Sequence, residues 1–287
     1  MTKEYAKDYS IAELMCARLA KEIEDWDVVV LGSFTPLAYA SYILAKVTYA
    51  PNCALIAYGA VDCRPFQLSF TRAESSATRG ATLLWTMLED LNSVHLKGRG
   101  DVEAISSIQA DQYGNINLSA VGEYDKPKLR GPGGAGAPEV IKMHRKMIGY
   151  FSSHNKMTFV PKVDVITGTR YVIDPEDRIK QGYRPGPIRY ITNLAVITKE
   201  YKAKPFKIES LHPGVTAEQV VENTGFPLEV PQSIPETEKP TKEEVRLLRE
   251  VIDPYGTMAF DFKPGKERLG YLKEILQKEL QSIGYDF

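Results

Sequence analysis

Two apolar stretches decide the fold of this chain: Asp27-Val-Val-Val-Leu-Gly32 and Cys53-Ala-Leu-Ile-Ala-Tyr-Gly59. Each is a continuous apolar run that ends at a glycine, which is typical of a strand buried on both faces. A predicted helix precedes each strand. Ser10-Ile-Ala-Glu13 has capping-box spacing and begins a helix that runs to about Ile23, and Pro36 begins another that runs to Ala45. Alternating helices and buried strands predict an α/β fold with an open, mostly parallel sheet and helices on both faces.

Ligands of such sheets bind beyond the carboxyl ends of the strands. Residues 32–36 and 58–65 are therefore predicted to form the functional rim. Further along, residues 102–111, 115–119, 157–167 and 190–198 read as strands joined by short turns, which predicts an antiparallel extension.

The C-terminal part divides from the rest at a proline- and acid-rich stretch. We expect residues 1–230 to form the α/β domain, with a helix capped by Thr216-Ala-Glu-Gln219 near its end. Residues 231–287 are expected to form a linker and a helical segment, in which Thr241-Lys-Glu-Glu244 caps one helix. The apolar stripe of residues 264–284 packs either on the body of the chain or on a partner subunit.

Composition excludes several classes of protein. A formal net charge of -1, with 43% hydrophobic and 25% charged residues, supplies no general field for nucleic acid or an anionic membrane. No apolar run approaches the roughly 20 residues of a bilayer span, and no signal-peptide core follows Met1. Cys16, Cys53 and Cys63 lack paired spacing, so neither a disulfide framework nor a zinc site is expected. A cytoplasmic protein is the expectation.

A glycine-rich loop, Gly131-Pro-Gly133-Gly134-Ala135-Gly136, satisfies the G-x-G-x-x-G pattern of dinucleotide-binding proteins. Its context argues against a nicotinamide cofactor, because a polar loop precedes it and His154 and Asn155 lie near the position that such sites give to an acidic residue. Two interpretations stay open. The loop is either a turn without a ligand, or a backbone segment whose N–H groups approach a phosphate or a developing oxyanion.

Several motifs together resemble the β subunit of glutaconate CoA-transferase: Asp111-Gln-Tyr-Gly-Asn-Ile-Asn117, Gly122-Glu-Tyr-Asp, the glycine loop, Val61-Asp62-Cys-Arg-Pro65 and Arg249-Glu-Val-Ile-Asp-Pro254. The resemblance implies an open α/β fold and an α-type partner subunit, in a heterodimer or heterotetramer. It also implies an active site in the cleft between the subunits, with the glycine loop near the thioester carbonyl of an acyl-CoA. Coenzyme A would enter as part of the substrate, with no other cofactor.

The chain departs from that family at one position. The transferases carry a glutamate at the end of the catalytic strand, which attacks the acyl-CoA and then carries CoA as a thioester. Here that position falls on Ala57 or Tyr58. Tyr58 either packs at the end of the strand or uses its hydroxyl to position water or to donate to an oxyanion, and Tyr58 and Asp62 are the catalytic candidates. Asp62 is the nearest carboxylate, and it is expected to be a turn residue that bonds local backbone N–H groups rather than a substitute nucleophile.

A second resemblance bears on this departure. Ser210-Leu-His-Pro-Gly-Val-Thr216 and Val163-Asp-Val-Ile-Thr-Gly168 are similar to the β subunit of the ring-opening hydrolase of bacterial steroid catabolism, which also lacks the glutamate. The favoured function is therefore hydrolytic opening of a CoA-linked cyclic or β-oxo substrate. A CoA-transferase with a displaced or partner-supplied nucleophile and a non-catalytic partner subunit remain alternatives.

Other polar residues carry weaker signals. Arg64, Arg72 and Arg79 follow the catalytic strand and are either solvated or bind a carboxylate or CoA phosphate, with Arg72 the candidate that we retain. His212 is interpreted as a turn histidine. His95, His144 and His154 show no mutual metal spacing, so the sequence assigns no metal.

Overall fold

The computed structural model describes residues 3–33, 35–64, 67–170, 175–184, 186–201 and 203–285. Phe34 and Pro65, which belong to the expected rim, lie outside the described residues. The chain divides into two compact units: unit 1 comprises residues 1–87 and 238–287, and unit 2 comprises residues 88–237. Within the described ranges, no helix combines the length and the apolar character that crossing a bilayer requires.

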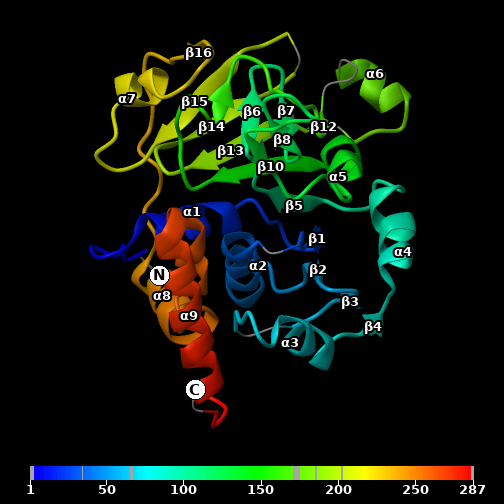
Figure 1. Ribbon diagram of the computed structural model, residues 1–287, viewed down its shortest axis with the longest axis vertical. Coiled ribbons are helices and arrows are strands. Elements are labelled where there is room, and N and C mark those ends of the chain that lie inside the picture. The colour runs from blue at the N-terminus through cyan, green and yellow to red at the C-terminus, as the bar shows by residue number, and fades with distance from the viewer. Residues whose placement is uncertain are drawn as a thin grey trace. The chain divides into compact units, whose positions relative to one another are not determined.

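Unit 1 is built on the two stretches that the sequence marked as buried strands. β1 (Val28–Val30) and β2 (Ala54–Ile56) pair in parallel, joined by α2 (Pro36–Thr48). The predicted capping box begins α1 (Ile11–Ala20), where Ser10 Oγ accepts from the Glu13 N–H and the Glu13 carboxylate accepts from the Ser10 N–H. Figure 1 shows α2 beside these strands. The helix–strand–helix–strand order is confirmed.

After β2 the chain forms a small antiparallel ribbon. β3 (Ala60–Val61) pairs with β4 (Leu83–Leu84), and α3 (Ala73–Arg79) lies between them in sequence. α4 (Met87–Asp90) and a π-helical turn, η1 (Leu91–His95), then begin unit 2.

The C-terminal segment belongs to unit 1. Its elements are α8 (Lys242–Leu247), η2 (Leu248–Ile252), η3 (Thr257–Phe262) and α9 (Gly265–Gln281). Tyr5 forms a bridge with Thr241, and Arg249 pairs with Glu13 on α1 at 2.6 Å. Figure 1 shows these orange and red elements together with the blue N-terminal helices. Of the two placements that the sequence left open, α9 packs on the chain's own body.

Six strands of unit 2 lie side by side in one sheet, in the order β16–β15–β14–β13–β10–β5. β10 lies parallel to both β5 and β13, whereas β14 is antiparallel to its two neighbours, which forms the predicted extension. The bounds are β5 (Val102–Ile105), β10 (Lys146–Phe151), β13 (Ile188–Thr192), β14 (Ala195–Lys199), β15 (Phe206–Leu211) and β16 (Leu228–Glu229).

Two strand predictions merged separate elements. Residues 190–198 contain the end of β13, a turn and most of β14, because Thr192 Oγ1 accepts from the N–H groups of Leu194 and Ala195 and ends the strand. Residues 102–111 contain β5 and β6, which belong to different sheets. β10 and β15 were not predicted at all.

A second sheet of four short strands, in the order β11–β6–β7–β12, and a two-stranded ribbon of β8 and β9 complete the β structure described for unit 2. Their bounds are β6 (Gln109–Asp111), β7 (Asn115–Asn117), β8 (Ala120–Val121), β9 (Leu129–Arg130), β11 (Phe159–Val160) and β12 (Gly168–Thr169). The helices are α5 (Ala137–Met143), α6 (Pro175–Lys180) and α7 (Ala217–Glu222), the last with the predicted Thr216 capping box. An aromatic core of Phe151, Phe159, Tyr190, Phe206 and Phe226 holds strands of the two sheets together.

Candidate functional site

The end of β2 is a tight turn without a carboxylate. Ala57 and Ala60 exchange backbone hydrogen bonds of 3.0 and 2.8 Å around Tyr58 and Gly59. Both central residues have positive φ, 54° and 77°, as in a type I′ hairpin turn. Ala57 is buried, so Tyr58 is the residue that the turn presents to solvent, with 39% of its surface exposed.

The Tyr58 side chain is a neutral phenol at the end of this turn. Its ring packs edge-on against Tyr39 of α2, with a centroid distance of 6.1 Å. Burial of the ring, with a smaller contribution from Glu74, raises the pKa of Tyr58 above its ordinary value. At neutral pH the hydroxyl therefore keeps its proton and can donate it in a hydrogen bond.

Asp62 lies four residues further and also has positive φ, 48°. Its carboxylate contacts side chains rather than the local backbone N–H groups that the sequence suggested. Lys46 Nζ lies 3.1 Å from one oxygen, and Thr82 Oγ1 and Arg64 Nη2 lie 3.4 and 3.8 Å from the other. The carboxylate is thus engaged by a lysine, which lowers its reactivity toward a thioester.

Arg72 precedes α3 and points to the C-terminal segment of unit 1. Its Nη2 lies 3.4 Å from the Tyr255 hydroxyl and 3.3 Å from Ser282 Oγ. Neither neighbour is charged, so the guanidinium retains its capacity to bind a carboxylate or phosphate.

The glycine loop connects β9 to α5 in unit 2. The N–H groups of Gly131 and Gly133 donate to the carbonyl oxygens of Ser119 and Leu118. A side chain at Gly131 would place its Cβ 2.1 Å from the Leu118 oxygen, so this close approach requires glycine. The exposed strand before the loop differs from the buried strand of a dinucleotide-binding site, as expected from the sequence, although a helix does follow.

The distal half of the loop presents backbone donors. Within the described residues, the N–H groups of Gly134, Ala135 and Gly136 make no hydrogen bond. Ala135 has φ of 42°, which turns successive N–H groups toward one side as in an anion-binding nest. These donors are free to bind an oxygen of a ligand.

Backbone strain is concentrated in the two predicted segments. The non-glycine residues with positive φ in the described part of the chain are Trp26, Tyr58, Asp62 and Ala135. The last three were each predicted as site residues, and each conformation costs about 1–2 kcal/mol. Strain of this kind persists where the surrounding structure enforces it, which occurs often at functional sites.

The four histidines divide into two that are held by hydroxyl and carbonyl groups and two that lie against each other. His212 is buried, with Nδ1 2.9 Å from Thr237 Oγ1 and Nε2 2.7 Å from the Thr192 carbonyl oxygen, so it is structural as predicted. His154 is likewise held by the hydroxyls of Thr192 and Thr224. His95 and His144, by contrast, come within 3.0 Å of each other, although their spacing in sequence gave no signal.

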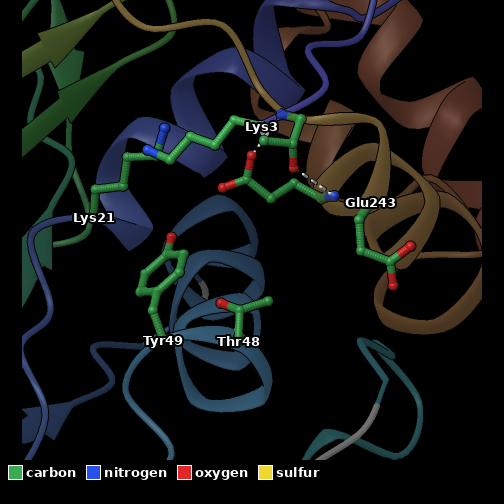
Figure 2. Close-up of a pocket in the computed structure, with 7 residues that line it drawn as sticks. Lys3, Lys21, Thr48, Tyr49 and Glu243 are labelled. Carbon is green, nitrogen blue, oxygen red and sulfur yellow. Dashed lines mark hydrogen bonds between the residues drawn. The ribbon is translucent and has the colours of Figure 1, made fainter. Parts of the chain in front are cut away.

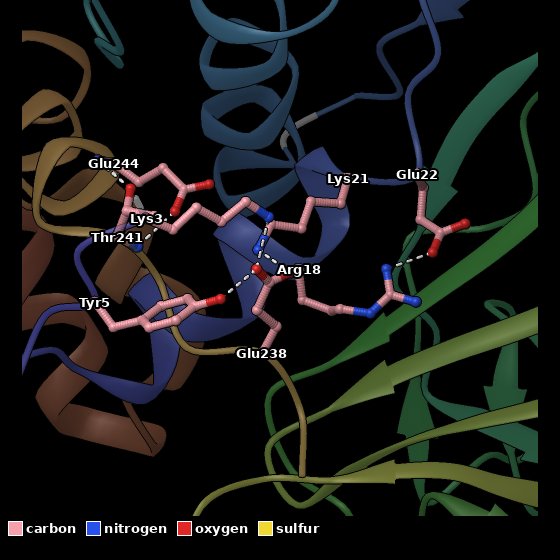
Figure 3. Close-up of polar contacts among 8 residues, drawn as sticks. All are labelled: Lys3, Tyr5, Arg18, Lys21, Glu22, Glu238, Thr241 and Glu244. Atoms are coloured by element: carbon pink, nitrogen blue, oxygen red, sulfur yellow. Dashed lines mark hydrogen bonds and ion pairs between the residues drawn. The ribbon is translucent and has the colours of Figure 1, made fainter. Parts of the chain in front are cut away.

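A surface pocket of about 430 Å³ lies elsewhere in unit 1 (Figure 2). It is lined by Lys3, Lys21, Thr48, Tyr49, Thr241, Glu243 and Glu244. Figure 3 shows that Lys3, Lys21 and Tyr5 bind Glu238, at 2.8, 3.0 and 2.9 Å. The hydrogen bond from Lys3, with support from Lys21 and Tyr5, lowers the pKa of Glu238 to about 2. Both lysines are therefore engaged by one carboxylate, and none of the predicted site residues lines this pocket.

Sequence relatives of known name cover most of the chain. The β subunit of the 3-oxoadipate CoA-transferase of Pseudomonas knackmussii is 32% identical over 243 residues, which cover 84% of this chain and 92% of that protein. The β subunit of the glutaconate CoA-transferase of Acidaminococcus fermentans is 30% identical over 254 residues, covering 86% and 94%. The cholesterol ring-cleaving hydrolase IpdB subunit of Rhodococcus jostii is 36% identical over 172 residues, covering 59% and 66%.

Solved structures agree with this relationship. The decarboxylase AibA/AibB superposes with a TM-score of 0.77 and 27% identity, covering 88% of this chain and 98% of that one. The glutaconate CoA-transferase of Acidaminococcus fermentans gives a TM-score of 0.77 and 26% identity, covering 91% and 100%. For the Rhodococcus jostii protein IpdAB the values are 0.70 and 27%, covering 90% and 100%.

A family model shows which part of the chain carries the likeness. The model for coenzyme A transferase matches residues 12–223, which include the β2 turn, Asp62, Arg72 and the glycine loop. The chain therefore belongs to the coenzyme A transferase family.

Proposed function

We propose that this chain is the β-type subunit of a heteromeric enzyme that acts on an acyl-CoA thioester without transferring CoA. The favoured reaction is hydrolytic opening of a carbon–carbon bond in a CoA-linked cyclic or β-oxo substrate, and an α-type subunit of the same family is the partner. The observation that carries this proposal is the end of β2, where Ala57 is buried and Tyr58 supplies a phenol in place of a carboxylate.

Covalent CoA transfer requires a nucleophile that can become an acyl anhydride and then a thioester. An alanine methyl group has no such chemistry, and the neutral Tyr58 phenol is a poor nucleophile. Asp62 is the carboxylate nearest in sequence, and its charge is engaged by Lys46 at 3.1 Å. Water is therefore the nucleophile that we assign.

In the proposed reaction, water attacks a ring carbonyl β to the thioester. The carbonyl oxygen becomes an oxyanion, for which the N–H groups of Gly134, Ala135 and Gly136 are the candidate donors. The ring carbon–carbon bond then breaks. Its electron pair passes to the carbon next to the thioester, which takes up a proton, and the attacked carbon becomes a carboxylate. The CoA thioester stays intact.

The comparisons are compatible with transfer and with other reactions. Proteins similar to this chain carry names of transferases, of a hydrolase and of a decarboxylase. The fold therefore accommodates several reactions, and the residues at the end of β2 are the feature of this chain that argues against transfer.

The reaction can be tested by following oxygen and CoA. The complex of this chain with its α-type partner, incubated with a CoA-linked cyclic β-oxo substrate in labelled water, should give a ring-opened product with one labelled oxygen in the new carboxylate. The product should still carry CoA, and the mass of this subunit should stay unchanged. The chain without its partner should show no turnover, because one wall of the active site is missing.

Other outcomes would favour the alternatives. A CoA-sized mass increment on this subunit that disappears in Asp62→Asn would identify a transferase with a displaced nucleophile. Unchanged turnover by the α-type partner with Tyr58→Ala or Asp62→Ala in this chain would identify a non-catalytic subunit.

The role of the Tyr58 hydroxyl has a matched control. Tyr58→Phe is expected to lower kcat about 10-fold or more with little change in KM, since the lost donor acts mainly in the transition state. Tyr39→Phe removes a buried hydroxyl that makes no hydrogen bond in the described structure and should leave kcat unchanged. Equal kinetics of both variants would show that Tyr58 serves only for packing.

A further inference from the structure

Three buried side chains from separate elements of unit 2 converge outside the site described above. His95 ends η1, Glu103 lies on β5, and His144 follows the last residue of α5. Their exposed fractions are 8%, 8% and 0%. His95 Nδ1 lies 3.0 Å from His144 Nε2 and 3.9 Å from Glu103 Oε2, and one ligand atom from each residue lies within 4.8 Å of the others.

Polar atoms in this cluster lack hydrogen-bond partners within the described structure: Glu103 Oε2, His144 Nδ1 and, beside them, Asp90 Oδ1. A buried carboxylate oxygen without a donor is stable when the carboxyl group is protonated or lies close to a cation. The arginines in this region have other partners. Arg145 and Arg184 bind Asp101 at 2.9 and 2.6 Å, and Arg170 donates to the carbonyl oxygens of Ile141 and His144.

We propose that His95, Glu103 and His144 bind a divalent transition metal ion, with Zn²⁺ as the ion that the ligands fit best. Two imidazole nitrogens and a carboxylate oxygen are a common ligand set for zinc. Bonds of about 2.0–2.2 Å in tetrahedral geometry place neighbouring ligand atoms roughly 3.3–3.5 Å apart. Two of the three separations, 3.0 and 3.9 Å, bracket this range, and all three ligand atoms lie within 4.8 Å of one another, so binding requires side-chain rotations that bring them together.

Asp90 would not bind the ion itself, but would hold one of its ligands, His95, in place. Its Oδ2 lies 3.6 Å from His95 Nε2, the nitrogen that faces away from His144. A carboxylate in that place fixes the ring and leaves the other nitrogen to the metal.

The site would link η1, β5 and the end of α5, the helix that directly follows the glycine loop. Gly100 makes room for the His144 ring, because a Cβ at position 100 would lie 2.4 Å from His144 Cε1 and Nε2. A bound ion would therefore fix α5 at its C-terminal end while the loop projects from its N-terminal end.

The test uses the full chain, free of tags and stripped with a chelator, titrated with Zn²⁺ and separately with Co²⁺. The wild type should bind one equivalent of either ion, and the Co²⁺ form should show the intense visible absorption of a tetrahedral site. Glu103→Gln should lose the tight equivalent, and Asp90→Asn should bind Zn²⁺ about 10- to 100-fold more weakly. Glu209→Gln, the same change on β15 of the same sheet, should bind as the wild type does.

Two further measurements distinguish the loss of a ligand from the loss of the fold. Circular dichroism verifies that each variant is folded, and X-ray absorption at the zinc edge of the wild type should show imidazole and oxygen ligands. Sulfur ligands would place the ion at the free cysteines instead, which would overturn the proposal. The absence of a stoichiometric ion from the wild type, or equal affinity in folded Glu103→Gln, would overturn it as well.

Discussion

Gly136→Val is expected to lower the turnover of the assembled enzyme about 10²-fold, the usual effect of losing an oxyanion donor. The N–H of Gly136 is one of three consecutive loop donors without a partner in the described structure. Its φ of -82° suits any residue, and no atom lies within 4 Å of an added Cβ. The isopropyl group would therefore add bulk next to the loop donors and hinder the approach of a ligand oxygen without straining the chain.

The choice of position matters for this experiment. A Cβ at Gly134 would lie 2.8 Å from Thr167 Cγ2, so a substitution there would disturb packing as well as function. Gly270→Val is the matched control, because Gly270 is an exposed glycine of α9 that also has no atom within 4 Å of an added Cβ. Steady-state kinetics of both variants should separate them. A fully active Gly136→Val enzyme would show that the loop is structural only.

The second large effect concerns stability. Glu279→Ala should destabilise unit 1 by on the order of 2 kcal/mol, because it removes the acceptor of two partly buried backbone N–H groups and of two hydroxyl groups. Glu279 is fully buried in α9, and its carboxylate accepts from Phe70 N at 2.7 Å, Thr71 N at 2.9 Å, Thr71 Oγ1 at 2.6 Å and Ser69 Oγ at 2.8 Å. The segment that it holds leads directly into Arg72.

Urea denaturation measures this effect as a shift of the midpoint. Glu274→Ala, an exposed glutamate of the same helix, is the control and should change the free energy of unfolding by no more than about 0.5 kcal/mol. Glu279→Gln keeps one acceptor oxygen and should fall between the two. Equal midpoints for Glu279→Ala and Glu274→Ala would show that α9 contributes little to unit 1.

Glu279 also shows why a chain segment outside the family match matters. The match ends at residue 223, yet α9 fixes the backbone in front of a predicted substrate-binding arginine. The apolar stripe of residues 264–284 predicted a packed helix but not its partner, since several surfaces offer equivalent apolar contact. The buried carboxylate selects one of them, because only residues 69–71 supply its donors within the described structure.

The amino-acid sequence by itself determined the elements whose signals are local. Apolar runs of the right length predicted β1 and β2, and three capping boxes predicted the starts of α1, α7 and α8, because these patterns act within a few residues. The motifs also identified the family and located the β2 turn and the glycine loop. Short strands such as β10 and β15 escaped prediction, since their pairing depends on neighbours far along the chain.

Only the tertiary structure decided the contacts between distant residues. It placed Lys46 against Asp62, gave Tyr58, Asp62 and Ala135 positive φ, and left the N–H groups of the glycine loop without partners. It also brought His95 and His144 to 3.0 Å across 49 positions of sequence. Ligand spacing within one segment reveals a site only when one element carries the ligands. Here η1, β5 and the position after α5 each contribute one residue, so the cluster exists only once the chain has folded.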